Sequence, residues 1–472
     1  MVFSSLTFLV FLIIVFSLYW LFDRRGQNIL LLVASYIFYG WWDWRFLGII
    51  FISSLLDYWI GLRIAGTDSP VHRKFYLGLT LAANLGLLGF FKYFNFFAES
   101  FGVLLNSLGM QASYTTLNIV LPVGISFYTF KTLSYNIDVY RRDCPAHRNL
   151  LEFLTFIAFF PELVAGPIMR ATNLLNQFVV PRFFDVEKAK DGVRQMIWGL
   201  FQKVVVADGL AAYVNEAYRR NGDAGGATLL LGTIFFAFQI YCDFAGYSNI
   251  ASGVARLFGF QLVRNFAYPY FSRNIAEFWQ RWHISLSTWF RDYFYIPIGG
   301  NRGSFARTIF NIVLTFTVSG LWHGANWTFV LWGLANGLLF LPILLKRRFS
   351  KEESGSIKSP PGYRDLPAII VNFGLILATW VLFRSENLGH ARQIFSSILN
   401  DFDWRFFLQD AARLKFLVAV LLLAEWLQRD KVHPLEIENL PVPVRWGIYN
   451  ATAFGIVLFG TFQYTPFIYF QF

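Results

Sequence analysis

The chain reads Ser319-Gly320-Leu321-Trp322-His323-Gly324-Ala325-Asn326-Trp327 near the middle of an uncharged run that extends from Thr308 to Leu345. That run has 38 residues without Asp, Glu, Lys or Arg. As one straight helix it would be about 57 Å long, nearly twice the hydrocarbon thickness of a bilayer. The run therefore predicts two membrane helices with a break close to His323.

His323 is the only titratable side chain in that run. A titratable group within apolar sequence is costly in lipid, so it is a candidate functional residue. The small residues Gly320, Gly324 and Ala325 leave room for a substrate or another backbone to approach the ring closely. Asn326, three positions later, would orient the ring if this segment is helical. The alternative is a histidine that only forms hydrogen bonds between packed helices.

The composition of the whole chain agrees with a membrane protein. Of its 472 residues, 56% are hydrophobic, 20% aromatic and only 15% charged, and the mean hydropathy is +0.46. These values exclude a disordered, collagen-like or disulfide-stapled secreted chain. The net charge of +11 comes from Lys and Arg residues that fall largely between apolar runs, which is typical of membrane loops and predicts no nucleic-acid partner.

Apolar runs recur along the chain and predict an all-α polytopic membrane fold. We expect about 11 transmembrane helices plus re-entrant or interfacial helices, which form a single membrane-embedded domain over residues 1–472. Besides 308–345, the runs lie near residues 2–22, 28–40, 46–65, 75–97, 117–139, 150–166, 194–214, 228–247, 366–383, 414–428 and 444–461.

The charges around the first run predict the topology. Asp23-Arg24-Arg25 follows it directly, and no Lys or Arg precedes it. The positive-inside rule then places this loop in the cytoplasm and the N-terminus outside. Without a small-residue cleavage site, we expect the first run to remain as a membrane helix.

A second candidate, His283, lies in a segment from Phe278 to Tyr293 that is typical of an amphipathic helix at the membrane interface. Taken alone, His283 also fits a structural role. One face of the predicted helix would carry Trp279, His283, Leu286 and Phe290.

The surrounding region from Arg256 to Arg307 contains seven Arg against Glu277 and Asp292. Such a surface suits the phosphates of coenzyme A or an acidic carrier protein. It suits anionic lipid headgroups on the cytoplasmic face equally well, so both alternatives stay open.

Four further ionisable residues fall within apolar sequence. Structural ion pairs or helix-end positions are the expected explanation for such groups. Neither a His-Glu-x-x-His zinc motif nor a phosphate-binding Walker loop occurs, and we expect no bound metal. The four residues are Asp57, Lys131, Glu162 and Asp243.

Several segments together resemble the membrane-bound O-acyltransferase (MBOAT) family, above all its bacterial branch, which exports acyl groups onto polysaccharides and cell-wall polymers. The resemblance covers roughly residues 117–340, and the tail Pro466 to Phe472 looks like the alginate O-acetyltransferase subgroup. The matching segments are Leu121 to Phe130, Phe159 to Ile168, Tyr241 to Gly253, Phe278 to Tyr293 and Gly320 to Gly337.

The resemblance implies that His323 is the catalytic histidine and that His283 is the second catalytic position. The candidate substrate-binding residues are Asn326, Trp322, Arg281 and Arg291.

The implied reaction is the transfer of an acetyl (acyl) group from a cytoplasmic thioester donor, acetyl-CoA or an acyl carrier protein, for O-acetylation of an exopolysaccharide such as alginate. No cofactor is expected to stay bound. The expected partners are the donor, membrane lipids, the polysaccharide acceptor and a periplasmic acetyltransferase, and the expected location is the inner membrane. The alternatives are D-alanyl or peptidoglycan acyl transfer by the same fold, or a transporter for a polymer or lipid-linked sugar.

Overall fold

Every regular element is a helix in the residues that the structure describes, which are 1–110, 116–220, 224–350, 360–463 and 467–468 of a computed structural model. The predicted all-α polytopic membrane fold is confirmed. Seven helical stretches among these residues are long and apolar enough to cross a bilayer, and the expected number of about 11 spans stays a prediction. Contacts group the chain into two compact units, and the expectation of a single domain likewise stays a prediction.

The first unit comprises residues 1–185 and 257–262. Its α-helices are α1 (Leu6–Tyr19), α2 (Arg24–Asp43), α3 (Leu47–Ala65), α4 (Pro70–Leu88), α5 (Phe94–Ser107), α6 (Ile125–Arg141), α7 (Leu150–Ala158), α8 (Phe160–Leu163) and α9 (Ala171–Val179). Predicted apolar runs overlap α1 to α4 and α6 to α8, whereas α5 lies mostly beyond the run near residues 75–97 and α9 corresponds to no predicted run.

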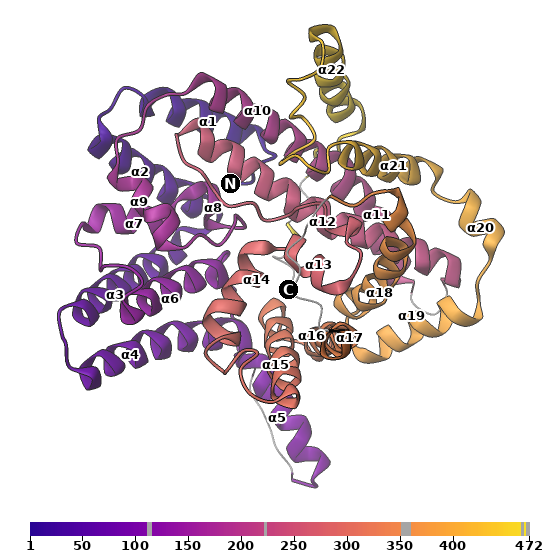
Figure 1. Cartoon of the computed structure of the whole chain (residues 1–472), viewed down its shortest axis with the longest axis horizontal. Coiled ribbons are helices and arrows are strands. Elements are labelled where there is room, and N and C mark those ends of the chain that lie inside the picture. Colours follow the sequence, from indigo (N-terminus) through magenta and orange to yellow (C-terminus); the bar gives the residue numbers. More distant parts are fainter. Residues whose placement is uncertain (111–115, 221–223, 351–359, 464–466, 469–472) are drawn as a thin grey trace. The chain divides into compact units, whose positions relative to one another are not determined.

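Helices α3, α4 and α6 lie side by side in the first unit (Figure 1). Between them the buried Asp57 carboxylate accepts hydrogen bonds from Thr80 (2.6 Å), Asn84 (3.0 Å) and Asn136 (2.9 Å). Among the described residues, Asp57 is therefore neither in an ion pair nor at a helix end, contrary to expectation, because uncharged donors from α4 and α6 satisfy it.

Lys131 of α6 and Glu162 of α8 form an ion pair, one of the two explanations expected for such residues, and both side chains are buried. Gly124, just before α6, has a φ of 74°, and a Cβ at this position would lie 2.7 Å from the carbonyl oxygen of Leu163. A glycine is required there, since an L side chain both disfavours this conformation and would collide with α8. Two of the family-like segments thus meet at this point.

The second unit comprises residues 186–256 and 263–472. Its α-helices are α10 (Val186–Leu200), α11 (Asp208–Arg219), α12 (Gly226–Leu257), α13 (Ile275–Arg281), α14 (Ile284–Phe290), α15 (Phe305–His323), α16 (Trp327–Leu338), α17 (Leu341–Ser350), α18 (Leu366–Arg384), α19 (Leu388–Asn400), α20 (Trp404–Gln409), α21 (Ala412–Leu427) and α22 (Val442–Phe459).

Asp243, in the middle of the long helix α12, is also explained by an ion pair. Its carboxylate lies 2.7 Å from the Nζ of Lys203, which also contacts Asp208 at 2.7 Å. Lys203 lies in a π-helical turn, Phe201–Ala207, between α10 and α11. Of the tail from residue 466 to 472, only Phe467 and Ile468 lie within the described residues.

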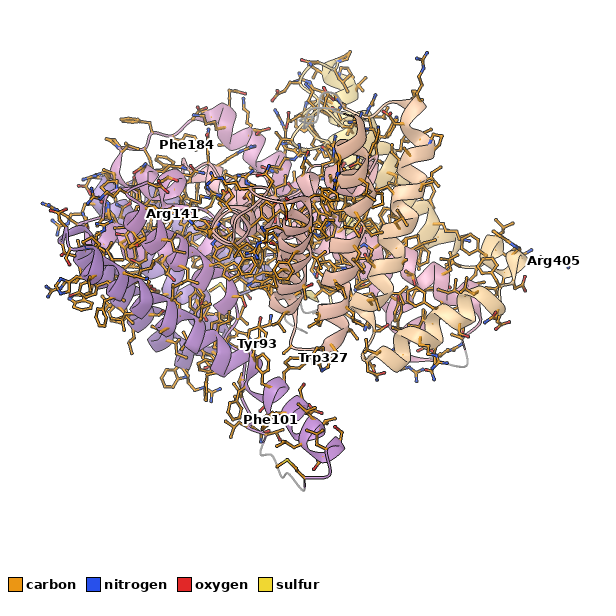
Figure 2. The ribbon with its side chains drawn as sticks, turned by 60° about the horizontal axis from the view of Figure 1, so that its bottom comes forward. Tyr93, Phe101, Arg141, Phe184, Trp327 and Arg405 are labelled. Atoms are coloured by element: carbon orange, nitrogen blue, oxygen red, sulfur yellow. The ribbon has the colours of Figure 1, made fainter. Side chains whose placement is uncertain are left out.

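The predicted break in the uncharged run is confirmed. Helix α15 ends at His323 and α16 begins at Trp327, and the two helices lie side by side with α18 next to α16 (Figure 1). Trp327 lies at the turn that joins α15 to α16 (Figure 2), and 53% of its surface is exposed.

Candidate active site

His323 is the last residue of α15 and is only 2% exposed. Its ring centre lies 5.0 Å from that of Trp322, 5.1 Å from Trp332 of α16 and 5.5 Å from Phe383 of α18. All three neighbours meet the imidazole edge to face, an arrangement that aromatic rings favour. The helix break therefore places His323 in a pocket of aromatic side chains.

Asn326 starts the next helix and does not orient the ring of His323, as it would in a continuous helix. Its Oδ1 accepts the backbone N–H of Thr328 (3.0 Å), the bond expected of a helix N-cap. Its Nδ2–H donates to the carbonyl of Glu386 (2.8 Å). Both ends of this amide thus hold the turn, and a role in substrate binding stays a prediction.

The glycines near His323 make room for a neighbouring helix. A Cβ at Gly320 would lie 2.2 Å from the carbonyl oxygen of Phe329, and a Cβ at Gly333 would lie 2.2 Å from that of Phe316. A Cβ at Gly324 would collide with the ring of Phe329 at 2.1 Å. Of the two alternatives that the sequence left open, the structure therefore supports the close approach of another backbone, that of α16.

His283 lies between two short helices, and the prediction of one amphipathic helix over this segment is wrong. Helix α13 ends at Arg281, Trp282 is extended, and His283 is left-handed with φ 42° and ψ 55°. The predicted common face with Trp279 is lost at this break. The physical reason is that the backbone on both sides of His283 bonds to residues 265 and 267 instead of continuing the helix.

The ring of His283 is completely buried. Its centre lies 4.6 Å from that of Phe244, 6.2 Å from Phe266 and 6.4 Å from Trp322. Phe467, from the end of the chain, packs on the same Phe244 at 5.6 Å. Burial lowers the pKa of His283 to about 3, so its imidazole is neutral throughout the physiological range.

Trp322 connects the two histidines. Its ring lies beside His323 on one side and within 6.4 Å of His283 on the other. Three residues that the sequence singled out from two segments thus come together in one aromatic cluster of the second unit. Of the six candidate site residues, these three form its centre.

Arg281 is not part of an exposed cationic surface, contrary to the expectation for the arginine-rich region. It is 5% exposed, its guanidinium lies 2.9 Å from the carboxylate of Glu277, and it donates a hydrogen bond to the carbonyl of Ala267 (3.0 Å). Glu277 also pairs with Arg273 at 2.9 Å. The i, i+4 spacing of Glu277 and Arg281 was visible in the sequence and indicates such a pair.

Arg291, by contrast, is solvent-accessible and lines a cavity. Its side chain is 60% exposed and contacts Asp292 at 2.6 Å. The cavity has a volume of about 390 Å³ and also contains Trp279 on its wall. The residues with polar side chains in its lining include Gln280, Ser287, Thr288, Arg291, Tyr295, Thr315 and Ser319.

The cavity follows one face of α15 toward His323. Ile312, Thr315 and Ser319 line it at helical spacing, and four residues after Ser319 the same face carries His323. Trp279, which also lines the cavity, has its ring centre 5.7 Å from that of Trp332, which in turn contacts His323. Contacts between aromatic rings therefore connect the lining of this cavity to the His323 ring.

Several residues of the site carried no local signal in the sequence. Trp332, Phe383 and Phe244 looked like ordinary apolar helix residues, and their contacts with the histidines depend on how distant helices pack. Asn265 is buried beside His283 but lies in a segment without helical periodicity.

Residues 37–384 match the model of the membrane-bound O-acyltransferase (MBOAT) family. This match spans both histidines, Trp322 and the cavity. The chain belongs to this family. The resemblance that the sequence motifs indicated is thereby confirmed, and the protein is an O-acyltransferase.

The chain is 42% identical over 428 residues to the probable alginate O-acetylase AlgI of Azotobacter vinelandii, which covers 90% of this chain and 83% of the relative. It is 38% identical to the protein of the same name from Pseudomonas putida, with both chains covered completely. The peptidoglycan O-acetyltransferase of Helicobacter pylori is 31% identical, with 78% of this chain and 73% of the relative covered.

Proposed function

We propose that this O-acyltransferase takes an acetyl group from a cytoplasmic thioester and passes it across the membrane for O-acetylation of an exopolysaccharide such as alginate. The observation that carries the proposal is the pair of buried histidines around Trp322, near a cavity whose lining includes the exposed Arg291. The similarity to alginate O-acetylases along the chain favours an exopolysaccharide as the acceptor.

His323 is the general base in this proposal. It accepts the proton of the attacking hydroxyl while that oxygen forms a bond to the thioester carbonyl carbon. The carbon–sulfur bond then breaks, and the thiolate takes up a proton as it leaves. Aromatic side chains surround the ring and exclude water, which protects the thioester from hydrolysis. A covalent acyl-histidine is the variant of this scheme that suits transfer to a further protein.

His283 supports the carbonyl in this proposal. A neutral imidazole has one N–H donor and one acceptor nitrogen, and His283 is neutral because burial holds its pKa near 3. Its N–H therefore donates to the carbonyl oxygen as negative charge develops there. Trp322, between the two histidines, forms the floor on which the acyl group lies.

The cavity along α15 receives the donor. Its apolar walls and scattered hydroxyl and amide groups suit the long, alternating apolar and amide arm that both acetyl-CoA and an acyl carrier protein present. Arg291 at its edge meets the phosphate of that arm. Arg281 contributes through its pair with Glu277, which holds α13 in place.

The location and partners follow from the same scheme. The Arg24-Arg25 pair after α1 supports a cytoplasmic position for that loop and an N-terminus outside, in a protein that we propose to lie in the inner membrane among lipids. Since the acceptor polymer lies outside that membrane, a periplasmic acetyltransferase partner collects the acyl group and delivers it to the polysaccharide. Peptidoglycan as acceptor is the second candidate, supported by the relative from Helicobacter pylori.

The test of the chemistry is His323→Ala at the wild-type expression level, with acetylated product as the measurement. Loss of a general base predicts a decrease of about 10²–10⁴-fold. His72→Ala, an exposed histidine of the first unit, is the matched control and should leave activity unchanged. Retention of more than about a tenth of activity in His323→Ala removes the base role from this residue.

The acceptor and the donor need separate measurements. Deletion of the gene should abolish O-acetyl groups on the exopolysaccharide, whereas selective loss from peptidoglycan would favour the second candidate. Arg291→Glu should raise the KM for the donor at normal expression, with a KM that increases with salt in the wild type. Arg302→Glu, an exposed arginine outside the cavity lining, is the control.

A further inference from the structure

His283 has a backbone conformation that its own side chain disfavours. Its φ of 42° lies in the left-handed region, where the Cβ of a non-glycine residue crowds the following carbonyl. Such a residue persists only where its surroundings hold it, and strained residues of this kind cluster at functional sites. The contacts around His283 should therefore include a residue whose task is to hold it.

Asn265 makes those contacts with both its backbone and its side chain. Its carbonyl accepts the N–H of Ile284 (2.9 Å). Its Oδ1 accepts both the N–H (3.3 Å) and the hydroxyl (3.0 Å) of Ser285. Its Nδ2–H donates to the hydroxyl of Ser248 on α12 (3.3 Å). Asn265 is 2% exposed, so water does not compete for these bonds.

The other side of His283 is held through backbone groups. The N–H of Ala267 donates to the carbonyl of Arg281 (2.9 Å), and the carbonyl of Ala267 accepts from the guanidinium of Arg281 (3.0 Å). The segment 265–267 therefore pairs with the chain on both sides of the left-handed residue. Within this segment, Asn265 is the residue that does so with its own side chain.

We propose that Asn265 is a positioning residue that locks the left-handed turn at His283 and thereby aims its imidazole at the reacting carbonyl. This inference rests on the proposed function of His283. The direction of the Cβ depends on φ and ψ, so relaxation of residue 283 to an ordinary conformation would swing the ring away from Phe244 and Trp322. An amide suits position 265 because it accepts from Ser285 and donates to Ser248 at once.

The test is a double-mutant cycle that combines Asn265→Ala with His283→Ala. In the wild-type background, Asn265→Ala should lower kcat by about tenfold to hundredfold, since a displacement of about 1 Å can cost that much. The donor KM should stay unchanged, because Asn265 lies outside the cavity lining. In the His283→Ala background the same change should cost less than about twofold, because the group that it positions is already gone.

If Asn265→Ala lowers the amount of folded protein, the milder variants Asn265→Asp and Ser248→Ala replace it in the same cycle. Asp keeps an acceptor for Ser285, and Ser248→Ala removes only the contact of Nδ2, so each should give a smaller loss of kcat that also disappears in the His283→Ala background. Equal losses in both backgrounds, with His283→Ala itself impaired, would overturn this inference alone. Full activity of His283→Ala would overturn the proposed role of His283 and, with it, this inference.

Discussion

His323 and His283 lie in the same unit and flank the same tryptophan, yet the chain holds them in opposite ways. His323 ends a regular helix, and its surroundings depend on glycines that let α15 and α16 approach closely. His283 interrupts a helix in a strained conformation, and polar groups of the preceding segment 265–267 hold it there. Close packing fixes one histidine and long-range hydrogen bonding fixes the other.

Because of this difference, the two regions should tolerate different kinds of substitution. Close packing fails when volume is added, because protein interiors leave few voids. A buried polar network fails when one partner is removed, because the remaining group is left buried without compensation. Substitutions that separate these two responses test the comparison directly.

The largest effect on stability is expected on the polar side, at Glu277. Glu277→Gln leaves Arg281 buried beside an uncharged partner, which we expect to cost about 3 kcal/mol or more of the free energy of unfolding. The measurement is denaturation of the detergent-solubilised protein, followed by tryptophan fluorescence at pH 7. Glu216→Gln, which removes a pair with Arg219 and Arg220 on an exposed surface, should leave stability close to that of the wild type, because water screens exposed ion pairs.

The pH dependence of the free energy of unfolding is a second test of the ion pairs of Glu277. Burial raises the pKa of Glu277, but its bonds to Arg273 and Arg281 outweigh burial and hold the pKa below its ordinary value of 4.5. The ionised carboxylate therefore stabilises the wild type fully above that value, and the contribution is lost as the pH falls through the lower, folded-state pKa. The stability difference between wild type and Glu277→Gln should narrow in that range. A difference that stays constant down to acid unfolding would contradict the role of the ionised pair.

The sequence predicted the His323 side of this comparison well because its causes are local. An uncharged run too long for one crossing must break, and the glycines at positions 320 and 324 show where helices approach closely. The glycines could not show whether a substrate or a helix fills that space. That answer depends on Phe329, which a second helix brings to the site.

The His283 side was predictable only in part because its causes are not local. The apolar periodicity from residue 278 to 293 is real, and no proline or glycine within it indicates a break. The break is caused by hydrogen bonds from Asn265 and Ala267, which periodicity cannot detect. Arg281 was placed on an exposed surface for a similar reason, since its burial follows from the fold of this loop.

The next effect is expected on the close-packed side, at Gly333. A Cβ there would lie 2.2 Å from the carbonyl oxygen of Phe316, so Gly333→Ala must push α15 and α16 apart. We expect a loss of about 1–3 kcal/mol in the free energy of unfolding, together with lower acyl transfer, because the His323 pocket opens.

The matched control is Gly374→Ala in α18, where a Cβ would meet nothing within 4 Å. This variant should be as stable as the wild type or slightly more so, since Ala is the better helix former. Equal stability of Gly333→Ala and Gly374→Ala would show that the contact between α15 and α16 is looser than the structure indicates.

A smaller effect on stability should follow from the different backbone conformations of the two histidines. At position 283, Gly should be more stable than Ala by about 1 kcal/mol, because glycine adopts the left-handed conformation without strain. At position 323, which is helical, Gly should be less stable than Ala by up to about 1 kcal/mol. Unfolding of the four single variants under one set of conditions checks this reversal. The same order at both positions would contradict the left-handed conformation of His283.

The smallest expected effect is on the shape of the pH–rate profile. Because burial lowers the pKa of His283 to about 3, this residue carries no charge between pH 5 and 8 and contributes no limb to the profile in that range. His283→Asn, whose amide still donates a hydrogen bond, should therefore reduce kcat but leave the apparent pKa values of kcat unchanged. The comparison requires saturating donor at each pH, so that binding does not shape the curve. A limb that moves or disappears in His283→Asn would mean that His283 titrates during turnover, and the division of roles between the two histidines would then have to be reversed.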